Sequence, residues 1–347
     1  MRVSIAIFAH NEEKQIGRAL ASLGEQDLVA EAAARNISIE IITLANGCTD
    51  STDAAANAAN VLLEKKHPAI RPRTELIAEP GKSNAWNTYV HRFSDPSADF
   101  LIFMDADITL IGTRTLNSLV ETLLNNESGH ISVDFIFKDL ALKKSRSLLE
   151  RASLAASRLN QNGAPKLAGS LYCARAHIAR GIWMPKGLLV EDGFLKAMIT
   201  TNHFTKPENA ALLIRASNAA HTFQAVTNLR CLLKHETRLL IGTWMNVVLF
   251  EHLQTRVAQT NLPAGHLIQA WNNTSPDWFH CLLNASATGD TFKKLCRSVV
   301  ALPFRQALQS TFTNCLRSFP TAFLRSVFTC FALVFARHSI RRQVYKW

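Results

Sequence analysis

Three common features are missing from this chain of 347 residues, and each absence excludes a class of protein. The seven cysteines stand singly, without a C-x-x-C pair, which argues against a disulfide framework or structural zinc site and suits a reducing compartment. The N-terminus has no cationic region followed by a longer apolar segment, so we expect no secretory signal and a cytoplasmic location. The uninterrupted apolar run at residues 326–336 covers 11 residues. A membrane-spanning helix needs about 20, so we expect none here.

Acidic residues are also absent from the end of the chain. Residues 291–347 contain ten lysines and arginines and no aspartate or glutamate, whereas the whole chain carries a net charge of +11. The remainder is nearly balanced, which argues against a nucleic-acid-binding protein. We expect a domain boundary near Gly289, with one domain at residues 1–289 and a basic, aromatic, helical tail at residues 290–347. The sequence leaves the oligomeric state open.

Short apolar strands alternate with helices along the first hundred residues. The pattern predicts strands at residues 3–8, 37–44, 74–78 and 100–104, and helices at residues 13–23, 52–66 and 83–92. Such alternation predicts an α/β fold with a Rossmann-like, mostly parallel twisted sheet flanked by helices. Ligands bind such sheets at the carboxyl ends of the strands, where four polar clusters of this chain fall.

The pattern is coarser beyond residue 129. It predicts strands at residues 130–137, 169–175 and 211–216, and helices at residues 140–159, 191–198 and 223–255. A C-terminal helical extension follows in the basic tail.

Two carboxylates, Asp105 and Asp107, directly follow the fourth apolar strand. A tight acidic pair is costly at such a place unless a cation lies there. Carboxylate oxygens suit Mg²⁺ or Mn²⁺, and either ion stabilises a departing diphosphate. The alternative is a solvated loop that caps a helix, since D-x-D is common by itself. The α/β context favours the metal.

An ordered series of motifs gives the chain a family resemblance. The segments are residues 4–13 with an N-E-E turn, residues 45–52, the G-K-x-x-A-x-N segment at residues 81–87, the D-x-D pair and the later Glu191-Asp192. This series resembles the family 2 glycosyltransferases of GT-A fold. The resemblance implies an inverting enzyme that moves a sugar from a nucleotide diphosphate sugar, typically a UDP-sugar, to a hydroxyl acceptor on a sugar or lipid-linked molecule. It implies a place in cell-surface polysaccharide or glycolipid synthesis.

The resemblance also assigns roles to residues. It implies donor binding by His10, Asn11, Glu12, Asn46, Lys82 and Asp105, with a divalent ion at Asp105 and Asp107. It makes Asp192 the catalytic base, and it places Glu191, Gly169, Arg238 and Trp244 on the acceptor side. Ala45 stands where many relatives carry an aspartate that contacts the base. No intact Q-x-x-R-W motif follows, which argues for single-sugar transfer rather than processive synthesis.

Each assignment has a structural alternative from the residues alone. Asn11 and Glu12 begin a helix in one alternative, and Asn46 belongs only to a turn. Lys82 is a solvated surface lysine in another. Glu191 and Asp192 are acids favoured by a helix dipole in a third. Arg238 is a structural helix residue, and His221 is either a third metal ligand or, more commonly for a lone histidine, no ligand.

The basic tail carries aromatic residues at intervals. They are Phe319, Phe323, Phe328, Phe331 and Phe335, with arginines between them. This pattern indicates an interfacial helix attracted to anionic lipid, and hence a peripheral position on the inner face of the membrane. The alternative is a helix that packs on the catalytic domain or on a second subunit. Rival functions for the whole chain are a degenerate nucleotide-sugar-binding or membrane scaffold protein, and a sugar nucleotidyltransferase.

Overall fold

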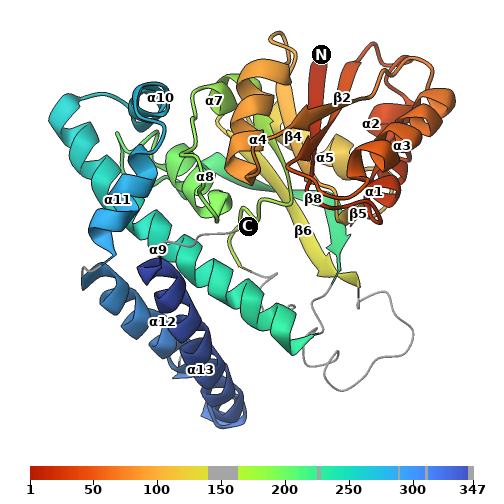
Figure 1. The fold of residues 1–347 in the computed structure, drawn as a ribbon. Coiled ribbons are helices and arrows are strands. Elements are labelled where there is room, and N and C mark those ends of the chain that lie inside the picture. The colour runs from red at the N-terminus through yellow and green to blue at the C-terminus, as the bar shows by residue number, and fades with distance from the viewer. Residues whose placement is uncertain (140–162, 225–227, 288–289, 309–311, 343–347) are drawn as a thin grey trace.

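A single eight-stranded sheet organises the computed structural model, which describes residues 1–139, 163–224, 228–287, 290–308 and 312–342 (Figure 1). The strands are β1 (Arg2–Ala9), β2 (Ser38–Asn46), β3 (Arg73–Ile77), β4 (Phe100–Asp105), β5 (Ile108–Leu110), β6 (Ile131–Lys138), β7 (Leu171–Arg175) and β8 (Leu213–Phe223). They are ordered β3-β2-β1-β4-β7-β6-β8-β5. The first four strands in this order run parallel, and the other half is mixed.

Strand β1 shows why helices cover both faces of the sheet. Successive side chains of a strand point to opposite faces, so Ile5 and Ile7 enter one core and Ala6 and Phe8 the other. Helices α1 (Ile16–Gly24), α3 (Thr52–Lys66) and α5 (Thr115–Leu124) contribute to the first core. Helices α4 (Lys82–Thr88), α8 (Glu191–Thr200) and α9 (Leu229–Thr260) contribute to the second. Strands buried on both faces require apolar residues throughout, as in this sequence.

Aromatic rings fasten helix α4 to the sheet. Trp86 stacks on Phe103 of β4, with 5.6 Å between ring centroids, and donates from Nε1 to the hydroxyl of Tyr172 on β7 (2.8 Å). Phe103 also stacks on Tyr172 at 4.5 Å. This buried stack fixes α4 beside β4, and therefore fixes the first residue of the helix, Lys82, beside the end of that strand.

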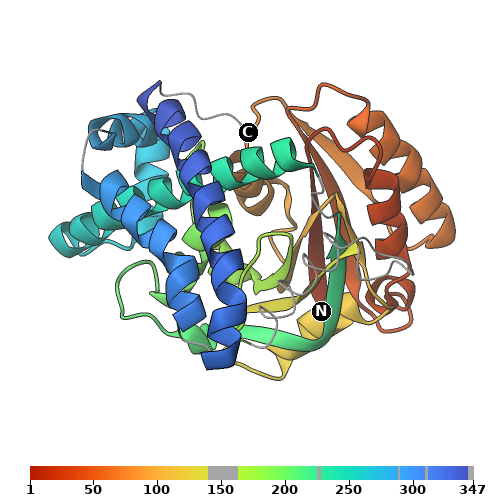
Figure 2. The same cartoon turned by 90° about the horizontal axis from the view of Figure 1, so that it is seen from below.

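Four helices follow α9 and form the far side of the molecule (Figures 1 and 2). They are α10 (Ala264–Thr274), α11 (Trp278–Ser286), α12 (Asp290–Leu308) and α13 (Phe312–Arg341). Helices α12 and α13 pack on each other, and both contact α9. Ala332, Leu333 and Ala336 of α13 are buried in the same core as Phe103, so the tail shares the core of the sheet domain. The shorter elements are α2 (Asp27–Ala30), η1 (Tyr89–Phe93), α7 (Ala176–Arg180) and η3 (Ala210–Leu212).

The predicted α/β fold with a mostly parallel sheet and a C-terminal helical region is confirmed. The helix expected at residues 140–159 and the boundary near Gly289 lie outside the described residues. Strand β8 extends to Phe223, so the helix expected from residue 223 begins at Leu229. The sequence predicts no membrane-spanning helix in the tail. In the structure α13 is continuous, and Ala322–Arg341 forms a 20-residue stretch of mean hydropathy 1.3 that is long and apolar enough to cross a membrane by length and composition.

Candidate active site

The turns after β1 and β2 are joined by side chains at the carboxyl edge of the sheet. Asn11 has a φ of 58°, a left-handed conformation that asparagine tolerates better than most residues. Its Oδ1 accepts a hydrogen bond from the backbone of Thr49 (2.7 Å). The backbone of Glu12 donates to the Thr52 hydroxyl (2.8 Å). The two turns, which the sequence placed at one edge, therefore form a single connected surface.

Asn46 ties the second turn to the segment that precedes α4. Its Nδ2 donates to the carbonyl of Glu79, and its Oδ1 accepts from the amide of Gly81, both at 2.7 Å. The carbonyl of Asn46 accepts from His10 Nδ1 (2.7 Å). Gly47 has a φ of 56° and approaches Pro80 so closely that a Cβ there would lie 2.6 Å from the proline Cβ. The Asn46 side chain thus orders the entrance to α4, in addition to lining the site.

Lys82 lies at the centre of an acidic network. Its Nζ contacts Asp105 Oδ1 at 2.6 Å and Glu191 Oε1 at 3.0 Å, and it donates to the carbonyl of Gly169 at 3.1 Å. Burial lowers the pKa of Lys82, but the two carboxylates outweigh it and raise that pKa above its ordinary value. The lysine is therefore a fixed cation, and the alternative of a solvated surface lysine does not describe it, since its side chain is 12% exposed.

Carboxylates crowd the opposite side of Asp105. Burial, with the charges of Asp107, Asp105 and Asp50, raises the pKa of Glu12 to about 7. Burial and Asp107 raise the pKa of Asp105 to about 6, against the nearby Lys82 cation. Carboxylates gathered this closely create a negative potential that suits a cation.

The donor set fits a divalent ion that is shared with a substrate. Mg²⁺ is commonly held by one or two carboxylates together with substrate phosphates, and Asp105 and Asp107 supply such a pair. Among the described residues, no group of three or more histidine, cysteine or acidic side chains forms a complete cage. The site therefore resembles a half-site that a diphosphate completes.

Glu191 and Asp192 begin helix α8 and approach the Gly169 turn. Gly169 has a φ of 46°, and a Cβ built on it would lie 2.9 Å from Glu191 Oε1, 3.5 Å from Asp192 Cβ and 3.6 Å from Lys82 Nζ. Asp192 Oδ1 accepts from the amide of Gly193 (2.7 Å). Burial, followed by the Glu191 charge, raises the pKa of Asp192. Asp192 thus directly follows Glu191, which is ion-paired with Lys82, the partner of Asp105. Asp192 does not line the large cleft between the strand ends and α9.

One face of α9 holds the segment that carries these acids. Arg238 Nη2 donates to the carbonyl of Leu189 (3.2 Å), and Asn246 Nδ2 donates to that of Val190 (2.9 Å). Between them, Gly242 lies so close that a Cβ there would be 2.1 Å from Val190 Cγ2. These three positions are four residues apart and share one helix face. Trp244, which the resemblance put on the acceptor side, is fully buried in the core and does not line the cleft.

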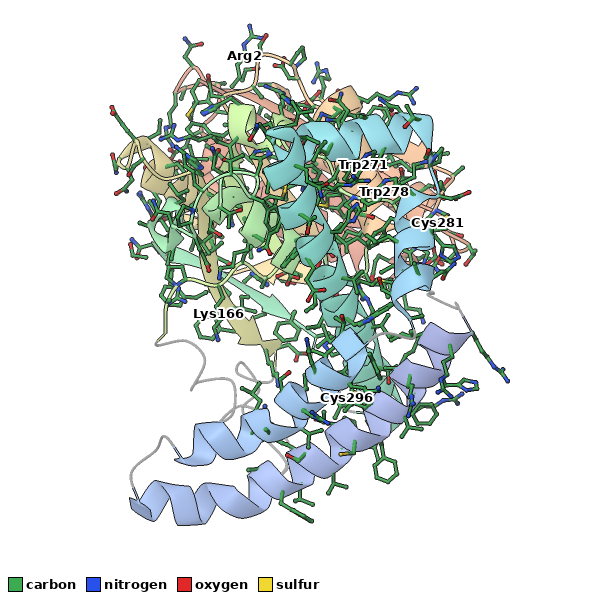
Figure 3. The ribbon with its side chains drawn as sticks, turned by 90° about the vertical axis from the view of Figure 1, so that its left-hand side faces the viewer. Arg2, Lys166, Trp271, Trp278, Cys281 and Cys296 are labelled. Carbon is green, nitrogen blue, oxygen red and sulfur yellow. The ribbon has the colours of Figure 1, made fainter. Side chains whose placement is uncertain are left out.

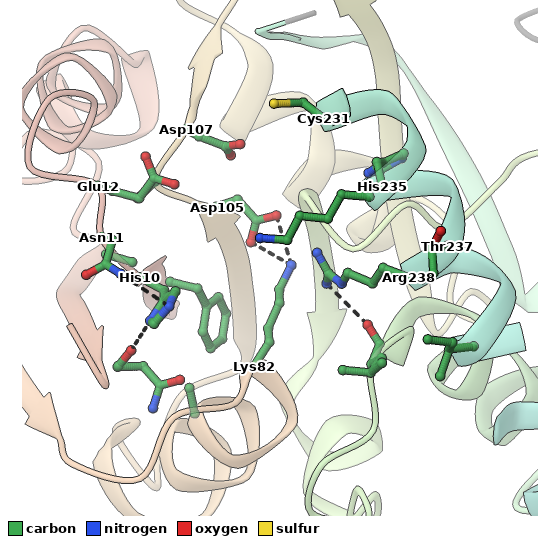
Figure 4. Close-up of a pocket in the computed structure, with 18 of the residues that line it drawn as sticks. His10, Asn11, Glu12, Lys82, Asp105, Asp107, Cys231, His235, Thr237 and Arg238 are labelled. Atoms are coloured by element: carbon green, nitrogen blue, oxygen red, sulfur yellow. Dashed lines mark hydrogen bonds and ion pairs between the residues drawn. The ribbon is translucent and has the colours of Figure 1, made fainter. Parts of the chain in front are cut away.

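A cleft of about 1050 Å³ lies between the strand ends and α9 (Figure 4). It is lined by the predicted His10, Asn11, Glu12, Asn46, Lys82, Asp105, Asp107 and Arg238. Sequence reasoning missed several further lining residues: Arg230, Lys234 and His235 of α9, and Phe335 and Ser339 of α13. No motif marks them, because each is one position on a long helix face. For Arg230, Lys234 and His235, the basic side chain was the signal in the sequence that could have indicated a place in the site.

A second buried network supports the turn beside Asp105. His221 Nδ1 donates to Asp134 Oδ2 (2.7 Å), and His221 Nε2 lies 3.1 Å from the Ser170 hydroxyl. The carbonyl of Ser170 accepts from the amide of Asp105 (2.9 Å). His221 is fully buried in this network. His221 therefore supports the backbone next to the acidic pair. This role differs from both sequence-based alternatives, a third metal ligand and a histidine without a part in the site.

Comparison with known proteins identifies the family. The model of glycosyl transferase family 2 matches residues 4–176, the part of the chain that carries the strand-end motifs. The chain belongs to glycosyltransferase family 2. It is thus a glycosyltransferase by family, as the motifs predicted. None of the curated proteins matches the chain.

Solved structures that this chain is similar to include glucosyl-3-phosphoglycerate synthase from Mycobacterium tuberculosis. Its complex with Mg²⁺ and UDP is 20% identical to this chain, with a TM-score of 0.43, over 66% of this chain and 73% of that one. Its complex with Mn²⁺, UDP-glucose and phosphoglyceric acid is 20% identical, with a TM-score of 0.44, over 69% of this chain and 77% of that one.

Proposed function

We propose that this glycosyltransferase moves a sugar from a UDP-sugar to a hydroxyl acceptor with inversion, and that it requires Mg²⁺ or Mn²⁺. The observation that carries the proposal is the cleft itself, in which Asp105, Asp107 and Glu12 face the basic residues of α9. Its volume of about 1050 Å³ is ample for a nucleotide sugar. UDP as the nucleotide, and a place in cell-surface polysaccharide or glycolipid synthesis, follow from the family resemblance and are part of the proposal.

The chain's own residues divide the work of donor binding. The joined turns of Asn11 and Asn46 offer polar groups for the base and ribose. Asp105 and Asp107 would hold the divalent ion, which when bound would supply positive charge to the diphosphate. Arg230, Lys234 and Arg238 line the facing wall, where cations suit the phosphate oxygens. Lys82 keeps Asp105 and Glu191 in place through its two ion pairs.

Asp192 is proposed as the general base. The acceptor oxygen forms a bond to C1 of the sugar while the bond from C1 to the diphosphate oxygen breaks, and the hydroxyl proton passes to the Asp192 carboxylate. UDP leaves with the electron pair of the broken bond. A raised pKa moves Asp192 towards the range in which an aspartate exchanges protons efficiently near neutral pH. Glu191 is already ion-paired with Lys82, which favours Asp192 for this role.

A donor screen tests the proposal. The full chain is incubated with several nucleotide sugars, with Mn²⁺ or with a chelator, and the release of free nucleotide is followed. Slow release of UDP from one UDP-sugar in the presence of Mn²⁺, without pyrophosphate, is expected, because water replaces a missing acceptor. Formation of UTP and sugar 1-phosphate when pyrophosphate is added would indicate a nucleotidyltransferase. Equal release of UDP with chelator would contradict the metal site.

A further inference from the structure

Helix α13 presents a continuous apolar face that no described part of the chain covers. Six large apolar side chains on it are 38–67% exposed: Phe323, Leu324, Val327, Phe331, Val334 and Phe335. At 3.6 residues per turn these positions fall on one side of the helix. The opposite side, with Ala332, Leu333 and Ala336, is buried against the core. Figure 3 shows the α12–α13 pair at the edge of the molecule, away from the sheet.

Exposed apolar groups of this density are unusual on a soluble surface. Elsewhere in the described chain, large exposed apolar residues occur singly or as a pair, such as Val61 and Leu62 on α3. A contiguous patch of larger size marks an interaction surface. The chemistry around this face indicates what the face contacts.

Exposed basic residues lie on the same helix pair as the apolar face, and the segment that bears this face has no acids. Lys293, Lys294 and Arg297 of α12 are exposed, as are Arg337 and Arg341 at the end of α13. Residues 291–347 contain no aspartate or glutamate. Pairing this face with the same face of a second copy would bring like charges together, whereas an anionic lipid surface complements both the apolar and the basic groups.

The apolar face of α13 continues into the catalytic cleft. Phe335, the last of its six residues, lines the cleft together with Ser339. Arg230, Lys234 and His235 of α9 line the same cleft. An amphiphile whose apolar part lies along α13 would thus bring an anionic or polar head towards the basic wall and the acidic pair.

We propose that the apolar face of α13 lies in the interfacial layer of an anionic membrane, and that the acceptor hydroxyl belongs to a lipid which enters the cleft past Phe335. The inference of a membrane contact depends only on the surface of α13. The inference of a lipid acceptor rests on the proposed transferase function. The helix lies in the plane of the membrane, because its other side packs on α9 and α12. Its length would suffice to span a bilayer, but a helix that is partly buried in its own domain cannot be surrounded by lipid.

Vesicle flotation tests the membrane contact. The full chain is mixed with phosphatidylcholine vesicles, with or without phosphatidylglycerol. It is expected to float with the anionic vesicles and to be released by high salt or alkaline carbonate. The double variant Phe331→Asp/Val334→Asp is expected to lose binding by about tenfold or more, because two charges then face the lipid. The matched control Val61→Asp/Leu62→Asp, at equally exposed positions of α3, should bind like the wild type.

Three outcomes would overturn the membrane contact. The first is a wild-type chain that stays unbound to anionic vesicles. The second is binding that resists carbonate, which would indicate a spanning helix. The third is a wild-type dimer in analytical ultracentrifugation that the α13 variant converts to a monomer, which would identify a second copy as the occupant of this face.

A paired activity measurement separates the acceptor from the transferase. UDP release into water should be the same in the wild type and the α13 double variant, because neither changed residue lines the cleft. Vesicles of a total membrane-lipid extract should raise UDP release by the wild type several-fold, but not by the variant. Flotation without this rise would contradict the lipid acceptor and leave the donor chemistry intact. Absence of any UDP release would contradict the proposed function while leaving the flotation result valid.

Discussion

The parallel half of the sheet and the helices from α9 onward contribute to the same cleft in different ways. The sheet half brings backbone turns and acids from strand ends, such as Asn11 after β1 and Asp105 at the end of β4. The helical half brings side chains spread along helix faces, such as Lys234 on α9 and Phe335 on α13. The family model covers the first half and ends at residue 176, before α9 begins.

The difference separates chemistry from recognition. Groups that act on phosphates and on a proton must be held within a fraction of an ångström. The end of β4 holds Asp105 in this way, and the ion pair with Lys82 holds Glu191, the neighbour of Asp192 on α8. Groups that would choose an acceptor lie on α9 and α13, which bring single side chains of a helix face to the cleft. We expect substitutions at the strand-end acids and at the acids of α8 to lower activity most, and substitutions on α9 to act through the positioning of those acids.

The largest effect is expected at the acidic pair. Asp107→Ala removes one of two carboxylates that hold the divalent ion, so UDP release should fall by about 10³-fold or more, and excess Mn²⁺ should not restore it. The matched control is Asp277→Ala, at an exposed position before α11, which should leave the rate unchanged. Near-normal activity of Asp107→Ala would contradict a need for the acidic pair in the reaction.

The next effect concerns the two acids of α8. Asp192→Asn keeps the shape of the side chain but removes the proposed base, so transfer should fall by about 10²- to 10⁴-fold with UDP-sugar binding unchanged. Glu191→Gln weakens the ion pair with Lys82 and should lower the rate less. Both are measured by transfer rate together with calorimetric donor binding. A greater loss in Glu191→Gln would exchange the two assignments.

A smaller effect tests whether α9 positions these acids. In Gly242→Ala, the new methyl would lie 2.1 Å from Val190 Cγ2 and displace the segment before Glu191. We expect kcat to drop about tenfold with little change in the KM for donor, and stability to fall by about 1–3 kcal/mol. Gly17→Ala on α1 has nothing within 4 Å of its new methyl and is the control. It should unfold at the same or a slightly higher temperature. Equal kcat and equal stability of the two variants would contradict the positioning of Glu191 and Asp192 by α9.

The smallest effect is a displaced acid limb in the pH profile. Burial and Glu191 raise the pKa of Asp192, so the proton stays on this carboxyl to a higher pH than on an ordinary aspartate with a pKa of about 3.9. A base works only when deprotonated, so kcat should fall with decreasing pH at a higher pH than that value predicts. The profile is measured at saturating donor and metal. A rate that stays constant down to pH of about 4 would contradict Asp192 as the base.

The parts of the fold that sequence predicted are those with strong local signals. Residues 3–8 and 100–104 are apolar throughout because both faces of their strands are covered, and they became β1 and β4. The three-residue strand β5 was missed, since Ile108–Leu110 is too short to show a period. The end of β8 was misplaced because Phe223 continues an apolar pattern into the segment before α9.

The candidate site divides in the same manner. The acids Asp105 and Asp107 stand in one short motif, and the predicted closeness of Lys82 follows from parallel strand ends. Asp134 was missed, because its link to His221 joins β6 to β8 through a side-chain pair that no spacing announces. Phe335 was recognised as part of an aromatic helix, but its place at the cleft depends on how α13 packs against α9.

Calorimetric titration of UDP is the measurement that tests the central claim most directly. The claim is that Asp105 and Asp107 bind a divalent ion which in turn binds the nucleotide's phosphates. The account predicts clear UDP binding by the wild type with Mn²⁺, and at least about tenfold weaker binding with chelator or in Asp107→Ala. UDP binding of equal strength with and without Mn²⁺, in the wild type and in Asp107→Ala alike, would contradict it.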